Sequence, residues 1–380
     1  MSRASIFDLL HQRQPISEPE TVASPVRDDY DADRLQLLDG VALTSAGLVS
    51  YDSLPEAHTP ALSSSLCGAD GYGLLVHEIT GLAEVSEPEL ARLETKALRL
   101  HKLVQSALVE ALMLLDRLPE ETGYDVVLSA PVASGEAAGI LIDRLRAVIA
   151  DTNYGDWLGE IRHSQQGSDP HTTLASPDGG MPYVLWISVD SVANDKDLVS
   201  PELRNVLVQN ARGKGLYPGE AAAAVLLHRL TEEGADPEHG WTLERAMVHE
   251  HPPRATRRDY EKRKAMSQML GEFWPEDDAL GAPSRIVIDA FGLPGRAVEV
   301  GGATIERWPE IDTIDDGIGV DGLCGWVGEA VTALMLVLAL AELKPQEHAV
   351  ILGVHAERCS RMWALRGPVS EATDAGEDHS

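Results

Sequence analysis

The sequence has few basic residues for its length. Its 380 residues include 31 Lys and Arg against 61 Asp and Glu, which gives a formal net charge of −30. A chain this acidic repels phosphate backbones and anionic lipid heads, so we expect neither nucleic-acid nor membrane-surface binding. Apolar residues still make up 44% of the chain, which is enough for a core and excludes global disorder.

Cysteine is also scarce. Cys67, Cys324 and Cys359 are too few and too scattered for a disulfide framework or a CxxC metal site. No glycine-rich phosphate loop precedes a Lys-Ser/Thr pair, so we expect no metal and no cofactor. The N-terminus has no apolar signal core, and the longest apolar run, 330–341, is about half of the ~20 residues that span a bilayer. These features predict a cytoplasmic protein.

The two ends of the chain differ from the middle. Residues 1–37 are acidic, polar and proline-bearing, which predicts a flexible leader. Ile6, Phe7, Leu9 and Leu10 leave a second interpretation open, a short motif that folds on a protein partner. Residues 367–380 form a second polar tail.

Between the ends, apolar runs alternate with amphipathic segments. We expect strands at 41–49, 125–129, 183–189, 221–230, 286–290 and 349–354, and helices at 86–118, 136–150, 201–210 and 328–343. Ser86 and Glu89 have the spacing of a capping box at the first helix. Residues 151–181 are polar and turn-rich and predict a long loop. Buried strands with helices between them indicate a layered α/β protein.

Three segments carry a family resemblance. The first is Trp186-Ile-Ser-Val-Asp-Ser191 followed by Gly215-Leu-Tyr-Pro-Gly-Glu-Ala-Ala-Ala-Ala-Val-Leu-Leu227. The second is Val287-Ile-Asp-Ala-Phe-Gly-Leu-Pro-Gly295 with Glu299, and the third is Gly325-Trp-Val-Gly-Glu-Ala-Val331. In this order they resemble the β-ketoacyl synthase branch of the thiolase-like superfamily, over roughly residues 40–365.

The resemblance implies a fold and an assembly. It implies a thiolase-like fold, layered α-β-α-β-α, made of two related halves at 38–232 and 233–366, each with a mainly parallel sheet. Members of this family commonly dimerise through the sheet edge of the first half, so a homodimer is expected.

The resemblance also implies a chemistry whose residues are missing here. In the family, a cysteine thiolate at a helix N-terminus takes the acyl group, and two histidines stabilise the enolate left by decarboxylation. In this sequence the nucleophile position falls near His163, and the histidine positions fall at Phe291 and about Trp326. The sequence therefore resembles a degenerate ketosynthase.

Two functional hypotheses follow. The first is a catalytically inactive binding or adaptor module for a protein partner, reached through the leader or the acidic surface. The second is an acyltransferase or thioesterase of altered mechanism, acting on acyl-CoA or acyl-carrier-protein thioesters through His163 or Ser134. Ser134 also has the position of a helix cap. An open cleft among Ser134, His163, Phe291 and Trp326 would favour the enzyme, whereas a pocket filled by Phe291 and Trp326 would favour the adaptor.

Overall fold

A computed structural model describes residues 30–368, apart from 85–89, 91–92, 176–179, 211–212, 232–239, 276–280 and 314–315. The leader up to residue 29, the tail from 369, the Ser86–Glu89 capping box and the boundary at 232 lie outside the described residues.

In the first half, the described residues form eight strands and four helices. They are β1 (Tyr30–Thr44), β2 (Gly47–Ser50), β3 (Ala61–Cys67), β4 (Gly73–Val76), α2 (Thr95–Met113), β5 (Tyr124–Ser129), α3 (Gly135–Ala150), β6 (Leu158–Ser164), α4 (Pro170–Leu174), β7 (Tyr183–Ser191), α5 (Asp195–Leu198) and β8 (Glu220–Thr231).

In the second half, the part of the chain that the structure describes adds six strands and four helices. They are β9 (Trp241–Glu244), β10 (Met247–Glu250), α6 (Asp259–Phe273), β11 (Arg285–Ile288), α7 (Arg296–Arg307), β12 (Gly317–Gly319), α8 (Val320–Cys324), α9 (Val331–Leu340), β13 (Ala349–Gly353) and β14 (Cys359–Arg366). Single 3-10 turns lie at Leu114–Arg117, Gly155–Trp157, Arg254–Thr256 and Gly328–Ala330.

The two halves repeat one strand order. The first runs β6-β5-β7-β8-β1 and the second β12-β11-β13-β14-β9. In the first half, β5 is parallel to both its neighbours, β6 and β7, and β8 pairs antiparallel with β7. In the second half, β11 is parallel to β12 and β13, and β14 pairs antiparallel with β13. Because β9 pairs antiparallel with both β1 and β14, the halves join into one twelve-stranded sheet. The expectation of mainly parallel sheets is wrong, because β1, β8, β9, β10 and β14 all pair antiparallel.

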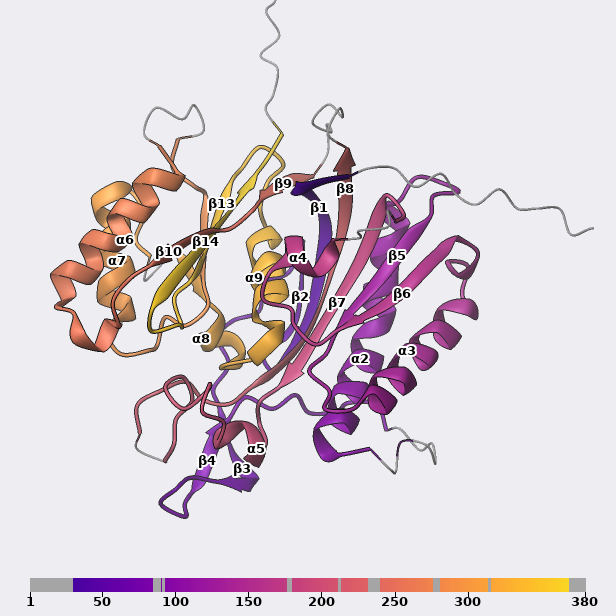
Figure 1. Ribbon diagram of the computed structural model, residues 1–380, viewed down its shortest axis with the longest axis horizontal. Helices are drawn as coiled ribbons and strands as arrows, with labels where there is room; N and C mark the ends of the chain where they lie inside the picture. Colours follow the sequence, from indigo (N-terminus) through magenta and orange to yellow (C-terminus); the bar gives the residue numbers. More distant parts are fainter. Residues whose placement is uncertain are drawn as a thin grey trace, which may run out of the picture.

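The helix α9 (Val331–Leu340) forms the middle layer of the molecule. Every residue of α9 is buried, and this helix packs between β1, β2, β7 and β8 on one side and β11 and β13 on the other (Figure 1). A helix apolar on all faces belongs in such a middle layer. The helices α2 and α3 cover the outer face of the first half, and α6 and α7 cover that of the second.

Five predicted segments differ from those observed. The strand expected at 41–49 is a hairpin of β1 and β2, and residues 30–37 of the expected leader belong to β1. The helix expected from 86 is α2, which begins at Thr95, and 201–210 forms turns. The loop expected at 151–181 contains β6 and α4. Only Ile161 of β6 is buried, because β6 is an edge strand, and its polar sequence therefore resembles a loop.

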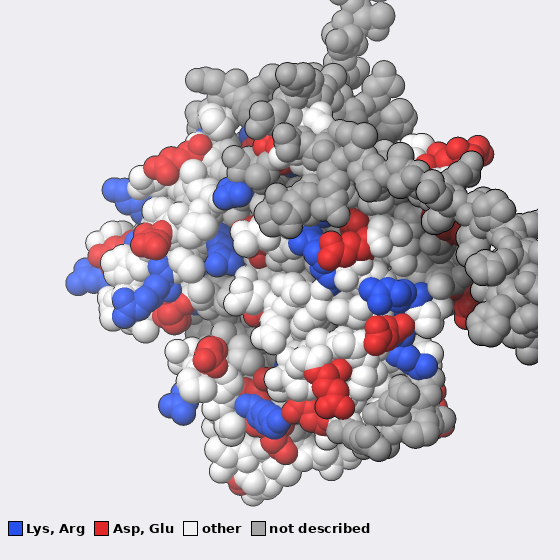
Figure 2. Space-filling view, turned by 45° about the vertical axis from the view of Figure 1, so that its right-hand side comes forward, with Lys and Arg blue, Asp and Glu red and all other residues white. Residues whose placement is uncertain are grey.

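The surface mixes both signs of charge. On the face shown in Figure 2, acidic and basic side chains are interspersed. No helix within the described residues is both long and apolar enough to cross a bilayer.

Candidate functional site

An aspartate–histidine pair lies where two neighbouring parallel strands end. Asp289 follows β11 directly and His355 lies two residues after β13, and Ile288 is paired with Leu352 in the ladder. Asp289 is fully buried, and its Oδ2 lies 2.5 Å from the Nδ1 of His355. A carboxylate can only accept, so Nδ1 carries the proton and Nε2 of the neutral ring keeps its lone pair.

The histidine is half-buried against an indole. The side chain of His355 is 35% exposed. Its ring centroid lies 4.7 Å from that of Trp326, with the planes tilted by 47°. Trp326 is 3% exposed, and its indole N–H has no acceptor among the described residues. Trp326 is fixed through its backbone, which donates to Tyr217 O and accepts from Gly219 N, each at 2.9 Å.

The loop that carries His355 is held by buried charges. Asp289 Oδ1 accepts the Val354 N–H at 2.8 Å, and Arg296 Nε donates to Val354 O at 2.7 Å. Arg254 donates to Ala356 O and, at 3.0 Å, to Cys359 O. Both guanidinium groups share the carboxylate of Glu299. These bonds orient His355 before any ligand binds.

Phe291 lies three residues after the end of β11, in the segment that also carries Asp289. Its N–H and that of Gly292 donate to the two carboxylate oxygens of Asp321, at 3.0 and 2.8 Å. Burial raises the pKa of Asp321 above its usual value, and these two bonds oppose that shift. The half-buried Phe291 ring lines a cavity of about 310 Å³ together with Ile288 and Leu323.

The other two candidate residues lie in the first half. His163 is in β6, and its Nε2 lies 2.9 Å from Ala130 O. Ser134 caps α3 by accepting the Ala137 N–H at 3.1 Å. Within the described part of the chain, no hydrogen bond or ring contact joins His163 or Ser134 to Phe291 or Trp326.

Several hydrogen bonds join the segment after β6 to the second half, among them those that Ser168 O accepts from Thr332 and Arg361. The Gly167 N–H donates to Glu329 Oε2 at 3.0 Å, and Glu329 lies three residues after Trp326. The segments that carry His163 and Trp326 are therefore in contact, although the imidazole of His163 itself lies against Ala130 O.

Sequence reasoning missed Asp289 and His355. Both strands were expected, at 286–290 and 349–354, but each was treated alone. The carboxyl ends of adjacent parallel strands are a common place for functional groups. A polar residue at the end of each expected strand was the signal that could have pointed to this pair.

Comparisons with known proteins support the fold. The sequence matches no protein-family model and no curated protein. Among solved structures, the ishigamide ketosynthase/chain length factor is similar with a TM-score of 0.52 and 12% identity, over 88% of this chain and 100% of that one. The PfaC ketosynthase–chain length factor is similar with a TM-score of 0.50 and 9% identity, over 92% of this chain and 44% of that one.

A variant of OleA from Xanthomonas campestris is similar with a TM-score of 0.48 and 12% identity, over 88% of this chain and 98% of that one. The first two matches and the repeated strand order define the class of architecture. The chain has the thiolase-like fold of condensing enzymes, which confirms the fold class expected from the sequence.

Proposed function

We propose that this thiolase-like protein does not carry out decarboxylative condensation and acts as a binding module for a protein partner. The observation that carries the proposal is the pair of side chains at the family's histidine positions. Phe291 offers no polar atom, and Trp326 is 3% exposed beneath His355. Neither can accept and return a proton at an enolate oxygen as imidazole does.

The cysteines support the same conclusion. Cys324 is fully buried at the C-terminal end of α8, where the helix dipole disfavours a thiolate, and burial raises the pKa of its thiol. Cys67 lies in the exposed strand β3, and Cys359 begins β14. None of the three lies at a helix N-terminus, where a nucleophilic thiolate is stabilised.

The surface offers a place for a partner. The hairpin of β3 and β4 projects from the body of the molecule (Figure 1), and Leu62 and Tyr72 on it are 69% and 70% exposed. Exposed apolar groups on a projecting element favour protein association. The part of the expected leader that precedes β1, residues 1–29, is the second segment through which the proposed partner binds.

The catalytic half of the proposal is tested by intact-mass measurement. The full-length protein is incubated with acetyl-CoA, malonyl-CoA and a malonyl-acyl-carrier protein. We expect no acyl adduct and no release of carbon dioxide. A stable adduct or decarboxylation of the malonyl thioester would contradict the proposal, and replacement of His163 or Ser134 by Ala would show whether either is the nucleophile.

The binding half is tested by photo-crosslinking in the organism's own cells. A photoreactive side chain is placed at Tyr72 in one variant and at residue 5 of the leader in another. Val109, which is 67% exposed on the outer helix α2, provides the control position. We expect one discrete heterologous partner at Tyr72 or in the leader and none at Val109. Equal labelling at all three positions would reject the binding role.

One observation favours a second candidate, hydrolysis of acyl thioesters. The Nε2 of His355, oriented by Asp289, would take a proton from water, and the hydroxide would add to the thioester carbonyl. The imidazolium would then return the proton to the departing thiolate. If this candidate holds, His355→Gln lowers the rate of thiol release from acyl-CoA by about 10²–10⁴-fold. His163→Ala then leaves that rate unchanged, and absence of thiol release from the unmodified protein excludes the candidate.

A further inference from the structure

A groove follows the edge strand of the second half. β12 pairs only with β11 within the described residues and ends the strand order. Two cavities, of about 530 and 310 Å³, border it and share Leu54, Gly317 and Ile318. Arg285 lines the first cavity and Phe291 the second, and we refer to the two adjoining cavities together as the groove. Its size is that of a small-molecule site.

Arg285 presents a guanidinium group with almost no partners. Its side chain is 17% exposed, and its only charged contact within the described residues is Glu342, 3.9 Å from Nη2. That distance is too long for a hydrogen bond. The Nε of Arg285 is buried and has no acceptor among the described residues. Burial lowers the pKa of Arg285, although Glu342 and Glu347 oppose this, so the group lacks the close anion that would compensate its desolvation.

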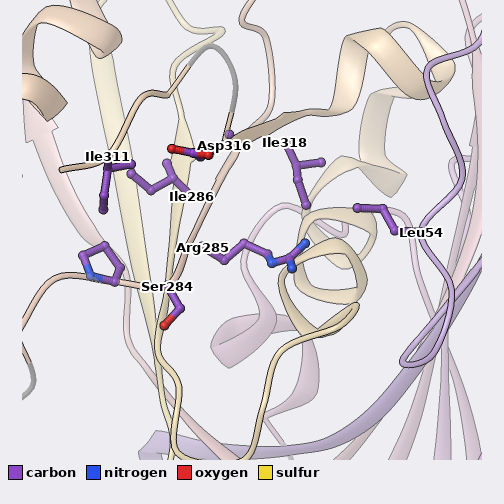
Figure 3. Close-up of a pocket in the computed structure, with 9 residues that line it drawn as sticks. Leu54, Ser284, Arg285, Ile286, Ile311, Asp316 and Ile318 are labelled. Atoms are coloured by element: carbon purple, nitrogen blue, oxygen red, sulfur yellow. The ribbon is translucent and has the colours of Figure 1, made fainter.

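The rest of the lining combines aliphatic side chains with a few polar ones, Ser284, Thr313, Asp316 and Asp321. In Figure 3 the guanidinium of Arg285 is directed toward Ile318 and Leu54, whereas Asp316 lies apart from it, beside Ile286. Asp316 is exposed, and its Oδ2 accepts the Asp312 N–H at 3.0 Å. The apolar lining side chains of the two cavities include Leu54, Ile286, Ile288, Ile311, Ile318 and Leu323.

We propose that this groove binds an unbranched aliphatic carboxylate, with its carboxylate on Arg285 and its chain along Ile318 and Leu54. A guanidinium group donates two parallel hydrogen bonds to the two oxygens of a carboxylate, and burial of each methylene against aliphatic side chains is favourable. An extended peptide with a free C-terminus would also offer a carboxylate. The aliphatic ligand fits better, because β12 has only three residues with which a peptide backbone could pair. The site is independent of the proposed binding module.

The test compares decanoate with decan-1-ol by isothermal titration calorimetry, both below the concentration at which they aggregate. We expect saturable binding of decanoate to the full-length protein. Arg285→Met keeps the length of the side chain and removes its charge, so it weakens decanoate binding about 10- to 100-fold and changes decan-1-ol binding less than twofold. Ile318→Trp fills the groove and weakens both ligands.

Arg263→Met is the matched control, since Arg263 is 46% exposed and pairs with Glu306 on the outer helices. It leaves both affinities unchanged. Arg285→Lys keeps the positive charge but cannot donate two parallel hydrogen bonds to a carboxylate. It therefore weakens decanoate binding more than Arg263→Met does and less than Arg285→Met does. The proposal is overturned if decanoate does not bind, if Arg285→Met binds it as the unmodified protein does, or if an apolar peptide with a free C-terminus displaces it at equal concentration. None of these outcomes bears on the partner of the β3–β4 hairpin.

Discussion

Three buried charged side chains of the second half, Arg254, Arg296 and Glu299, contact one another. Arg254 and Arg296, with side chains 1% and 3% exposed, share the carboxylate of Glu299, which is itself 3% exposed. Arg254 also donates to the backbone oxygens of Ala356 and Cys359 and to the Ser360 hydroxyl. Arg296 donates to Val354 O and, at 3.4 Å, to the carboxylate of Glu357. Such a set stabilises the fold only while every member is present, because a buried charge that loses its partner keeps its desolvation cost.

Removal of the shared carboxylate therefore destabilises the protein strongly. We expect Glu299→Ala to lower the free energy of unfolding by about 3–5 kcal/mol, since it removes the carboxylate that pairs with the buried Arg254 and leaves Arg296 only its contact with the partly exposed Glu357. Denaturation by urea measures the loss. On the same helix, Glu306 is 46% exposed and pairs with Arg263, and Glu306→Ala serves as the control with a loss under about 1 kcal/mol. Equal losses at the two positions would show that the buried set is not coupled.

His77 is a buried histidine that lies beside a second histidine, His58. Its Nδ1 lies 3.0 Å from that of His58 and 3.5 Å from Ser45 Oγ, and its ring centroid lies 6.3 Å from that of Tyr217. Burial, and then the charge of His58, lower the pKa of His77 from 6.5 to about 4. The unfolded chain takes up this proton first, so the stability tied to His77 is complete above about pH 6.5 and falls as the pH drops toward 4.

The His77→Asn variant should lose that acid sensitivity. We expect the difference in unfolding free energy between pH 7 and pH 4.5 to shrink by up to about 3 kcal/mol. Urea denaturation across this range measures it, and the same replacement at His249, on β10, controls for the loss of an imidazole. An unchanged pH profile would mean that His77 is protonated equally in both states.

Single residues show where sequence reasoning ends. Phe291 and Trp326 were identified from the sequence because each lies within a single short motif, 287–295 or 325–331. His355 and Asp289 lie 66 positions apart. Their contact exists only because β11 and β13 are adjacent in the sheet, and no spacing along the chain records that.

At the scale of elements, Ser134 is the start of a helix. Its side chain accepts the Ala137 N–H, and it precedes the first turn of α3. Ser134→Ala should cost about 1 kcal/mol of unfolding free energy through loss of the cap, and Ser134→Asp should restore it. Thermal or urea denaturation measures both. If Ser134 were instead a nucleophile, the Asp variant would recover stability and lose any acyl adduct.

Most elements found from sequence are long apolar runs. The strands β5, β7, β8, β11 and β13 and the helix α9 are near-continuous apolar runs, and all were expected. The helices α2 and α3 were expected from their amphipathic pattern.

The missed strands are β3, β4, β6, β9, β10, β12 and β14. Of these, β6, β9, β10 and β12 lie at an edge or a join of the sheet and expose part of their side chains, so their composition resembles that of loops. The strand β14 is largely buried, but Ser360 and Arg361 interrupt its apolar residues.

The whole molecule contains a symmetry that its sequence does not display. The two halves share one strand order, yet no repeat is visible between the segments that build them. Packing of sheets on one central helix constrains the arrangement of strands far more than the residues within each strand. This is why motifs in a fixed order indicated the fold, while the site that the fold assembles had to be read from contacts.

The edge strand β6 leads to a prediction about assembly. It ends the sheet of the first half, and within the described residues its outer side is not paired. We expect a homodimer in which two β6 strands meet antiparallel, with a mass in solution twice the 41.0 kDa of the chain. Light scattering after gel filtration measures that mass. In a background without native cysteines, Glu160→Cys, exposed on β6, should then form a disulfide across the interface.

Arg146→Cys, which is also exposed but lies on the outer helix α3 and not on the pairing strand, should stay reduced under the same oxidant, because a disulfide forms only where the two Cα atoms lie within about 7 Å of each other. A dimer that crosslinks at Arg146→Cys and not at Glu160→Cys would put the interface elsewhere, and a monomeric mass would remove it. The distinction matters for function. Strand pairing at β6 covers the segment leading from His163 to Gly167, so a dimer would close one side of the region where the two halves meet.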